Sequence, residues 1–381
     1  MRNIVAAATL ALAFGVSGAA LAEPLKVGMI TTLSGGGAGL GVDARDGFML
    51  ALKNAGDAAK EISVVTEDDG QKPELAVQIA DKMIQSEQVD VLTGIIWSNL
   101  AMAVVPSAVA QDKLYLSVNA GPSALAGAGC NANYFNVAYQ NDNFHEAMGQ
   151  YANETYKKTF IMAPNYPAGK DSLTGFKRYY KNELAGEIYT QVGQTDYAAE
   201  IAQIRASGAD SLFIFLPGGM GIAFMKQYAQ SGVEIPVIGP GFSFSQDVLP
   251  AIGDAALGVK NSASWSPDLD NEANKVFVDG FKAAYGRVPS VYAAQAYDTA
   301  NLLVSAAGKA SVKDPEAFRA ALKAADFASV RGKFKFNTNN HPIQDIYVRE
   351  VMKDGDVLTN KIIATAFTDH GDAYAEQCAL K

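Results

Sequence analysis

Residues 25–31 read LKVGMIT, an apolar run that is followed by a glycine-rich loop and then by helical periodicity from about Val42 to Asn54. The same alternation continues along the chain. The expected elements are strands at 62–66, 89–93 and 114–118 and helices at 73–86 and 101–111. Apolar strands separated by amphipathic helices of this length indicate βαβ units. The pattern therefore predicts an α/β fold with a parallel sheet covered on both faces.

A second α/β series begins after Asn136. Its expected helices are 144–156, 172–184, 198–206 and 222–231, and its expected strands are 160–163, 188–191, 211–216 and 236–239. Two successive series of this kind, joined near Ala138, predict two similar Rossmann-like lobes with parallel-rich sheets. A chain of 381 residues is also longer than one hydrophobic core usually supports.

The remainder of the chain is expected to complete a hinge. Residues 272–324 form three helical segments, which we expect to cover the first lobe, and strand-like runs at 334–337 and 346–352 are placed to cross back between the lobes. Several crossings keep two lobes in register while a few residues absorb a rotation. We therefore expect a clamshell with lobe 1 at 23–138 plus 266–344 and lobe 2 at 139–265 plus 345–381.

The first 22 residues have the features of a secretory signal peptide. Arg2 precedes an apolar stretch from Ile4 to Gly15, and Ala20-Leu21-Ala22 is a small-residue cleavage site. The mature chain is expected to begin at Glu23, which is not a cysteine, so no lipid anchor is predicted. The alternative is a buried N-terminal helix. The signal indicates a protein that works in the periplasm.

The charge and the cysteine and histidine content limit the classes of partner, cofactor and cross-link that the sequence predicts. The formal net charge is −9 and no stripe of Lys or Arg occurs, which argues against nucleic acid or an anionic membrane as the partner. Cys130 and Cys378 could form a disulfide in an oxidising compartment, and the alternative is two unrelated buried thiols. The two cysteines and three dispersed histidines have no metal-ligand spacing, so neither a metal nor a cofactor is predicted.

Motifs for catalysis are incomplete. The loop at residues 34–41, SGGGAGLG, does not satisfy G-x-G-x-x-G and is not followed by G-K-[ST]. The chain contains no G-x-S-x-G nucleophile motif. The sequence therefore gives no positive sign of an enzyme.

A carboxylate site is predicted at the carboxyl ends of two strands in the first series. Residues 94–99 follow the strand at 89–93 and precede the expected helix start at Ala101, so Ser98 and the neighbouring N–H groups could hold an anion. Asn119 and Gly121 follow the strand at 114–118 in the same way. The alternative for Ser98 is an ordinary helix N-cap.

Apolar residues in loops around the same predicted cleft are candidates for the body of a ligand. Trp97, Phe242, Phe244 and Tyr292 are the aromatic candidates. Three further candidates for the ligand site are Leu40, Ala168 and Gly219.

Several segments in the same order are similar to one family. They are Lys26–Gly35, Asp90–Gly94 with Ser98, Pro106, Leu116-Ser117, Tyr197–Asp210, Gly239-Pro240 and Tyr285–Ser290. The chain resembles the type I periplasmic solute-binding proteins of ABC transporters, the family of the leucine/isoleucine/valine-binding proteins. The resemblance implies a monomeric Venus-flytrap protein that delivers a small ligand to an ABC permease in the inner membrane. It also implies a ligand carboxylate held by Ser98 and by main-chain groups at Asn119 and Gly121.

One departure from the family pattern bears on the ligand. Amino-acid-binding members carry a glutamate after the Gly-Pro of the second lobe, whereas residues 239–244 here read GPGFSF. A buried ammonium without a carboxylate partner costs several kcal/mol. The chain therefore resembles the branch that binds aromatic carboxylates. The alternatives are a branched-chain amino acid binder in which Asp171 replaces the glutamate, and a secreted sensor domain or α/β enzyme.

Overall fold

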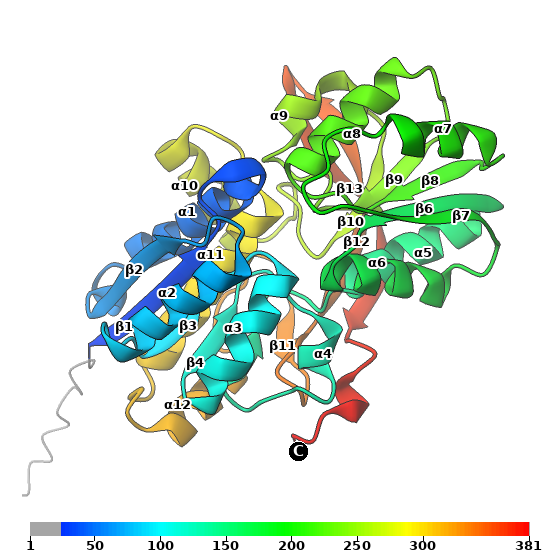
Figure 1. Cartoon of the computed structure of the whole chain (residues 1–381). Coiled ribbons are helices and arrows are strands. Elements are labelled where there is room, and N and C mark those ends of the chain that lie inside the picture. The colour runs from blue at the N-terminus through cyan, green and yellow to red at the C-terminus, as the bar shows by residue number, and fades with distance from the viewer. Residues whose placement is uncertain (1–23, 381) are drawn as a thin grey trace, which may run out of the picture.

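The computed structural model describes residues 24–380 and contains two α/β lobes, so the predicted fold class is confirmed (Figure 1). The predicted signal peptide lies outside the described residues. Within them, no helix is long and apolar enough to cross a bilayer.

The first lobe contains a five-stranded sheet in the order β2-β1-β3-β4-β5, and every pair is parallel. Its strands are β1 (Leu25–Thr31), β2 (Ile62–Asp68), β3 (Val91–Thr93), β4 (Leu114–Ser117) and β5 (Tyr134–Asn136). In β1, six of the seven residues are buried, as expected of a strand that is covered on both faces.

Helices from two distant parts of the chain cover this sheet. They are α1 (Ala38–Ala55), α2 (Pro73–Gln85), α3 (Ser98–Ala110) and α4 (Ser123–Ala126), followed much later by α10 (Glu272–Tyr285), α11 (Val291–Ala307) and α12 (Pro315–Lys323). Helix α11 packs along α1, so the late helices return to the first lobe as predicted (Figure 1). Short 3-10 turns occur at Gly35–Gly37 and Gly56–Ala59.

The second lobe contains an eight-stranded mixed sheet, in which β11-β12-β10-β9-β8-β6-β7 is the main order and β13 pairs with β12. Its strands are β6 (Lys158–Pro164), β7 (Glu183–Thr190), β8 (Ser211–Ile214), β9 (Val237–Pro240), β10 (Lys260–Ala263), β11 (Phe334–Phe336), β12 (Pro342–Asp354) and β13 (Val357–His370). Its helices are α5 (Asn143–Thr155), α6 (Pro167–Tyr179), α7 (Ala198–Ala206), α8 (Gly219–Gln230) and α9 (Leu249–Ile252), with 3-10 turns at Gly253–Ala256 and Ala375–Gln377.

Some element boundaries differ from the sequence predictions. The helix expected at 172–184 is α6, which begins at Pro167 because the fixed φ of proline suits the first helical position. The end of that expected helix belongs to β7, whose residues pair in parallel with β6. Helix α3 begins at Ser98 and not at Ala101. Strands β5, β10 and β13 were not predicted.

The chain passes between the lobes three times, after β5, after β10 and after α12 (Figure 1). Strand β11 already pairs with β12 in the second sheet, and the expected boundary at residue 344 lies inside β12. The lobe boundaries given above stay a prediction.

The C-terminal tail contacts both lobes. Cys130 and Cys378 form a disulfide with a Cα–Cα distance of 5.6 Å, so the predicted pairing is confirmed and the tail is tied to the loop after α4. On the other lobe, Tyr374 Oη donates to Asp142 Oδ2 over 2.8 Å, and His370 Nε2 lies 2.6 Å from Glu146 Oε2 on α5. The tail therefore links the first lobe to the second outside the three chain crossings.

Candidate functional site

A small cavity lies between the lobes, at the carboxyl ends of strands from both sheets. Residues of both lobes line it: Leu40, Ile96, Trp97, Ser98, Asn119, Tyr139, Tyr166, Ala168, Phe215, Pro217, Phe242 and Tyr292. None of these side chains carries a charge at neutral pH. The volume open to the centre of a water molecule is about 10 Å³, which suits about one water. A larger ligand can enter only if the lobes or the aromatic side chains move.

The strand ends explain why these residues meet. Trp97 and Ser98 follow β3, while Tyr166, Phe215 and Phe242 follow β6, β8 and β9 of the other sheet. In open α/β sheets the loops after the strands meet at one edge, and ligands bind there. With two lobes facing each other, the two sets of loops enclose a single space.

Ser98 is the first residue of α3 and is 2% exposed. Its Oγ accepts a hydrogen bond from Asn141 Nδ2 over 3.1 Å. The N-cap of α3 is Trp97, and no side chain caps it. The N–H groups of the first helical turn have no partner inside the helix, and the helix dipole favours a negative charge beside them. The N-cap alternative for Ser98 is therefore not what the structure has.

Asn119 and Gly121 are placed differently. The Asn119 side chain lines the cavity, where its Nδ2 donates to Ile96 O over 2.7 Å and its Oδ1 accepts from Tyr139 Oη over 3.4 Å. Gly121 is not among the lining residues, and its N–H donates to Asn141 Oδ1 over 3.1 Å. The main-chain group of Gly121 is therefore already bonded within the protein.

Aromatic rings form most of the cavity wall. The ring centroids of Phe242 and Tyr139 are 4.6 Å apart, and those of Trp97 and Tyr166 are 6.2 Å apart. Burial raises the pKa values of the Tyr139, Tyr166 and Tyr292 hydroxyls, so all three remain protonated. Tyr166 and Tyr292 can therefore donate hydrogen bonds to an acceptor on a ligand, whereas Tyr139 Oη already donates to Asn119 Oδ1.

Glycines allow the two lobes to approach at the rim. Gly218 has φ = 63°, and a Cβ there would lie 2.9 Å from Gly36 O of the first lobe. Gly219 does not line the cavity, but a Cβ there would lie 3.3 Å from the same oxygen. Gly37 is needed for another reason, because a Cβ would lie 2.6 Å from Trp97 Cζ2. The glycine-rich loop thus seats the Trp97 ring and contacts the second lobe.

The structure brings together seven of the nine predicted ligand-site residues: Leu40, Trp97, Ser98, Asn119, Ala168, Phe242 and Tyr292. Phe244, another aromatic candidate, is fully buried away from the cavity lining. Tyr139, Tyr166 and Phe215 line the cavity but were not predicted. The signal that could have found Tyr166 and Phe215 is their position directly after apolar strands.

Asp171 does not line the cavity. Its Oδ2 accepts from the Ser123 N–H over 3.0 Å and from Asn141 Nδ2 over 2.9 Å, and its Oδ1 accepts from Ser123 Oγ over 2.7 Å. The carboxylate that could have replaced the missing glutamate is therefore bonded to residues outside the cavity.

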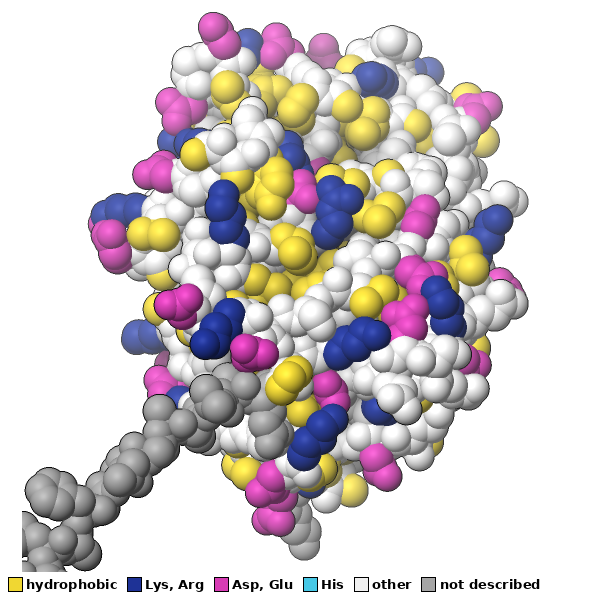
Figure 2. Space-filling view, turned by 90° about the vertical axis from the view of Figure 1, so that its left-hand side faces the viewer, with side chains coloured by type: hydrophobic (Ala, Val, Ile, Leu, Met, Phe, Trp, Pro, Cys, Tyr) yellow, Lys and Arg dark blue, Asp and Glu magenta, His cyan; other side chains and the backbone are white. Residues whose placement is uncertain are grey.

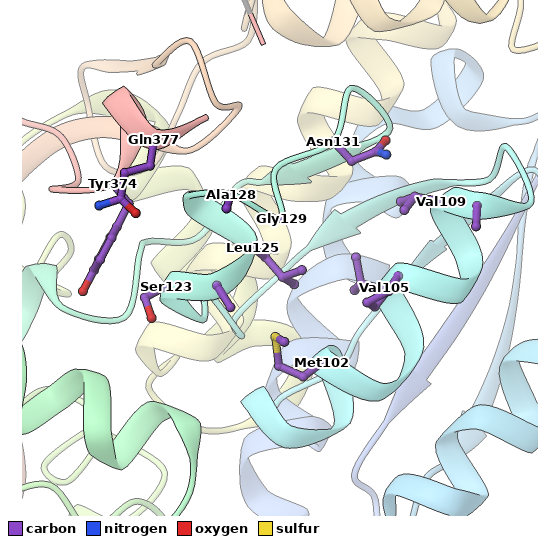
Figure 3. A pocket seen from close by; sticks show the side chains of 13 residues that line it. Met102, Val105, Val109, Ser123, Leu125, Ala128, Gly129, Asn131, Tyr374 and Gln377 are labelled. Atoms are coloured by element: carbon purple, nitrogen blue, oxygen red, sulfur yellow. The ribbon is translucent and has the colours of Figure 1, made fainter. Parts of the chain in front are cut away.

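Wider hollows lie elsewhere on the described residues, and two of them have no predicted ligand-site residue in their walls. One is an apolar groove of about 700 Å³ between α3 and α4, with Met102, Val105 and Leu125 in its wall (Figure 3). The other is a cleft of about 750 Å³ that contains Asp43 and Asp247. Within the described part of the chain, no group of three or more His, Cys, Asp or Glu could hold a metal ion. On the face shown in Figure 2, charges of both signs are interspersed.

Comparisons with known proteins agree with the two-lobed fold. A family model described as periplasmic binding protein matches residues 24–356. An ABC-transporter solute-binding protein from R. palustris, in complex with benzoate, is 32% identical, with a TM-score of 0.88 and coverage of 94% of this chain and 100% of that chain. Another from Rhodopseudomonas palustris BisB5, in complex with 3,4-dihydroxybenzoic acid, is 29% identical, with a TM-score of 0.84 and coverage of 92% and 99%. The Leu/Ile/Val-binding protein homolog 6 of Brucella melitensis biotype 1 is 27% identical, with coverage of 97% of this chain and 98% of that protein.

Proposed function

Because the chain belongs to the periplasmic binding protein family of ABC-transporter solute-binding proteins, we propose that it captures an aromatic carboxylate between its lobes. After closure it would present this ligand to its permease in the inner membrane. Capture by closure requires no chemical change in the ligand, so we propose that the protein has no enzymatic activity.

The observation that carries the proposal is an uncharged cavity with aromatic walls and one helix N-terminus. Once the lobes or the aromatic side chains have moved to make room, the ring of an aromatic acid would pack between Trp97, Tyr166 and Phe242, where apolar surface is removed from water. Its carboxylate would face Ser98 and the first N–H groups of α3. Asn119 and Tyr292 would complete the polar contacts, and Leu40 and Ala168 would fill the sides.

Two residues proposed from sequence act indirectly in this scheme. Gly121 would support the site through its hydrogen bond to Asn141, and Gly219 would allow the rim to close on Gly36. We also propose that residues 1–22 direct export to the periplasm and are removed there. The mature protein would act as a monomer with no nucleic acid partner.

Branched-chain amino acids are the second candidate, because a relative is named for Leu/Ile/Val binding. Their ammonium group requires a carboxylate or an equivalent set of acceptors when it is buried. The described cavity lining offers no carboxylate, and Asp171 already accepts three hydrogen bonds from Ser123 and Asn141. The lining therefore favours a ligand that carries a negative charge alone.

Thermal unfolding with added ligand tests the ligand class. A ligand at 100 times its dissociation constant adds about 2.7 kcal/mol to the free energy of unfolding. We expect benzoate or 4-hydroxybenzoate to raise the Tm and leucine, isoleucine and valine to leave it unchanged. The opposite pattern would favour the amino acid alternative. Mass spectrometry of benzoate recovered after incubation should show it unchanged, and a converted product would contradict the absence of enzymatic activity.

A further inference from the structure

Asn141 lies on the first crossing between the lobes, just before α5, and is 1% exposed. Its Oδ1 accepts from the Gly121 N–H over 3.1 Å. Its Nδ2 donates to Ser98 Oγ over 3.1 Å and to Asp171 Oδ2 over 2.9 Å. Because an N–H group can only donate, Gly121 fixes which end of the carboxamide is the oxygen. The amide nitrogen is therefore held toward both a cavity residue and a carboxylate.

The Asp171 carboxylate joins the two lobes. It is carried by α6 of the second lobe, and its two partners on Ser123 belong to the first turn of α4 in the first lobe. Figure 3 shows Ser123 at the start of that short helix. Hydrogen bonds of 2.7 and 3.0 Å across the interface can exist only while the lobes lie together. The contact between Asp171 and Ser123 is thus a marker of closure.

The hydrogen bond from Asn141 Nδ2 also determines the direction in which the Ser98 hydroxyl group can donate. A hydroxyl group has one hydrogen to donate, and the lone pair that accepts from Asn141 Nδ2 directs that hydrogen elsewhere. Ser98 lines the cavity, so its hydrogen is available to an acceptor inside it. Without the Asn141 donor, nothing in this network would prevent Ser98 from turning its hydrogen toward residue 141.

We propose that Asn141 is a positioning residue that couples ligand binding to lobe closure. One amide nitrogen makes Ser98 a donor toward the ligand carboxylate and, in the same step, holds Asp171 against Ser123. The inference rests on the proposed function, since it takes Ser98 as the carboxylate donor. If the lobes open so that Asp171 moves away from Asn141, the hydrogen bond that helps to fix the Asn141 amide is lost. The open state would therefore bind the ligand less tightly.

The test begins with Asn141→Asp, which keeps the shape and the acceptor for Gly121 but removes both donated bonds. Ser98 would then donate to the new carboxylate, and Asp171 would meet a like charge. We expect the Kd for benzoate, measured by calorimetry, to rise about 10- to 150-fold, the range for a lost charge-assisted hydrogen bond. Asn301→Asp, on α11 away from the cavity, adds the same charge and is expected to leave the Kd unchanged.

A second variant is a control for the charge of Asp171. In Asp171→Asn, the amide oxygen can take the place of Oδ2, where it accepts from the Ser123 N–H and from Asn141 Nδ2, and the amide nitrogen can donate to Ser123 Oγ. Closure is followed by hydrogen exchange at the Ser123 amide, which donates to Asp171 in the present structure. We expect faster Ser123 exchange and weaker benzoate binding in Asn141→Asp. In Asp171→Asn, we expect the Ser123 protection and the Kd for benzoate to stay close to those of the wild type.

Asp171→Ala provides a variant in case Asn141→Asp does not fold. It lies outside the cavity lining, yet we expect it to weaken benzoate binding about tenfold, since Asn141 Nδ2 loses one of its two acceptors. It should also speed Ser123 exchange, since the Ser123 N–H loses its acceptor. Wild-type benzoate affinity in both Asn141→Asp and Asp171→Ala, or unchanged Ser123 exchange in these two variants, would overturn the inference. Wild-type protein that does not bind benzoate would instead contradict the proposed function, and Ser123 exchange in the unliganded variants would then decide the inference alone.

Discussion

Arg331 Nε donates to Asp298 Oδ2 over 2.8 Å, and neither side chain has exposed surface. Arg331 Nη1 also donates to Ala138 O and Gln344 Oε1, each over 2.9 Å. Ala138 lies on the first crossing and Gln344 near the start of β12, so the buried ion pair joins these two segments to α11.

Asp298→Asn should therefore be strongly destabilising. Removing one partner leaves the buried Arg331 charge unpaired, and breaking such a pair costs about 3–5 kcal/mol. Urea unfolding of the unliganded protein measures the loss. Asp279→Asn, at an exposed position on α10, is the control and should change the free energy of unfolding little. Equal stabilities for the two variants would show that this ion pair is dispensable.

Ser98→Ala should weaken ligand binding and leave folding nearly unchanged. The lost charge-assisted hydrogen bond predicts about a 10- to 150-fold increase in the Kd for benzoate. Because Ser98 does not cap α3, the Tm without ligand should stay close to that of the wild type. Calorimetry and melting of the one variant check both statements, and an unchanged Kd would remove Ser98 from the site.

Asp247→Asn should stabilise the protein at alkaline pH. Both Asp247 carboxylate oxygens are buried without a hydrogen-bond partner within the described residues. Burial, with a smaller effect of Asp43, raises the pKa of Asp247 to about 7. Because the folded-state pKa lies above the unfolded one, the stability of the protonated form is fully present below about pH 4 and is lost as pH rises through 7.

At pH 8 we expect the free energy of unfolding of Asp247→Asn to be roughly 1–3 kcal/mol larger than that of the wild type, because this is the cost of one unsatisfied buried polar group. At pH 4 the two should be close. Melting at both pH values, with Asp279→Asn alongside, measures the difference. A gain that is the same at both pH values would show that ionisation of Asp247 is not its cause.

Removing the disulfide should destabilise the protein and free its tail. In the chain-entropy model, closing the 248-residue separation between Cys130 and Cys378 contributes about 5.5 kcal/mol. Cys130→Ser with Cys378→Ser should lower the Tm and speed amide exchange around Tyr374. Thiol labelling of the denatured wild type without reductant should find no free thiol, and two labelled cysteines would contradict the bond.

Most of the fold could be predicted because parallel strands buried on both faces leave continuous apolar runs, as in β1. Strand β13 was not predicted because few of its residues are buried and its buried and exposed residues do not alternate regularly. Its only local sign is the turn Asp354-Gly355-Asp356, where Gly355 has φ = 60°. The start of α3 at Ser98 was not predicted because the apolar periodicity of this helix begins only after its first turn.

The site could be predicted only in part, for a different physical reason. Residues that follow strand ends, such as Ser98, Asn119 and Phe242, are set by local topology. Asn141 contacts Asp171, which is 30 residues away in the sequence, and Asp171 contacts Ser123 of the first lobe. No periodicity encodes such a contact, because it depends on how the two finished lobes face each other.

The chain contains two tryptophans, and their placement gives the protein an internal optical signal. Trp97 borders the cavity, while Trp265 is fully buried and donates from Nε1 to Asn274 Oδ1 over 2.6 Å. A ring that enters the cavity changes the surroundings of the first indole and leaves the second in its fixed setting. Emission from the unlabelled protein can therefore follow ligand capture in real time, with Trp265 as a constant background.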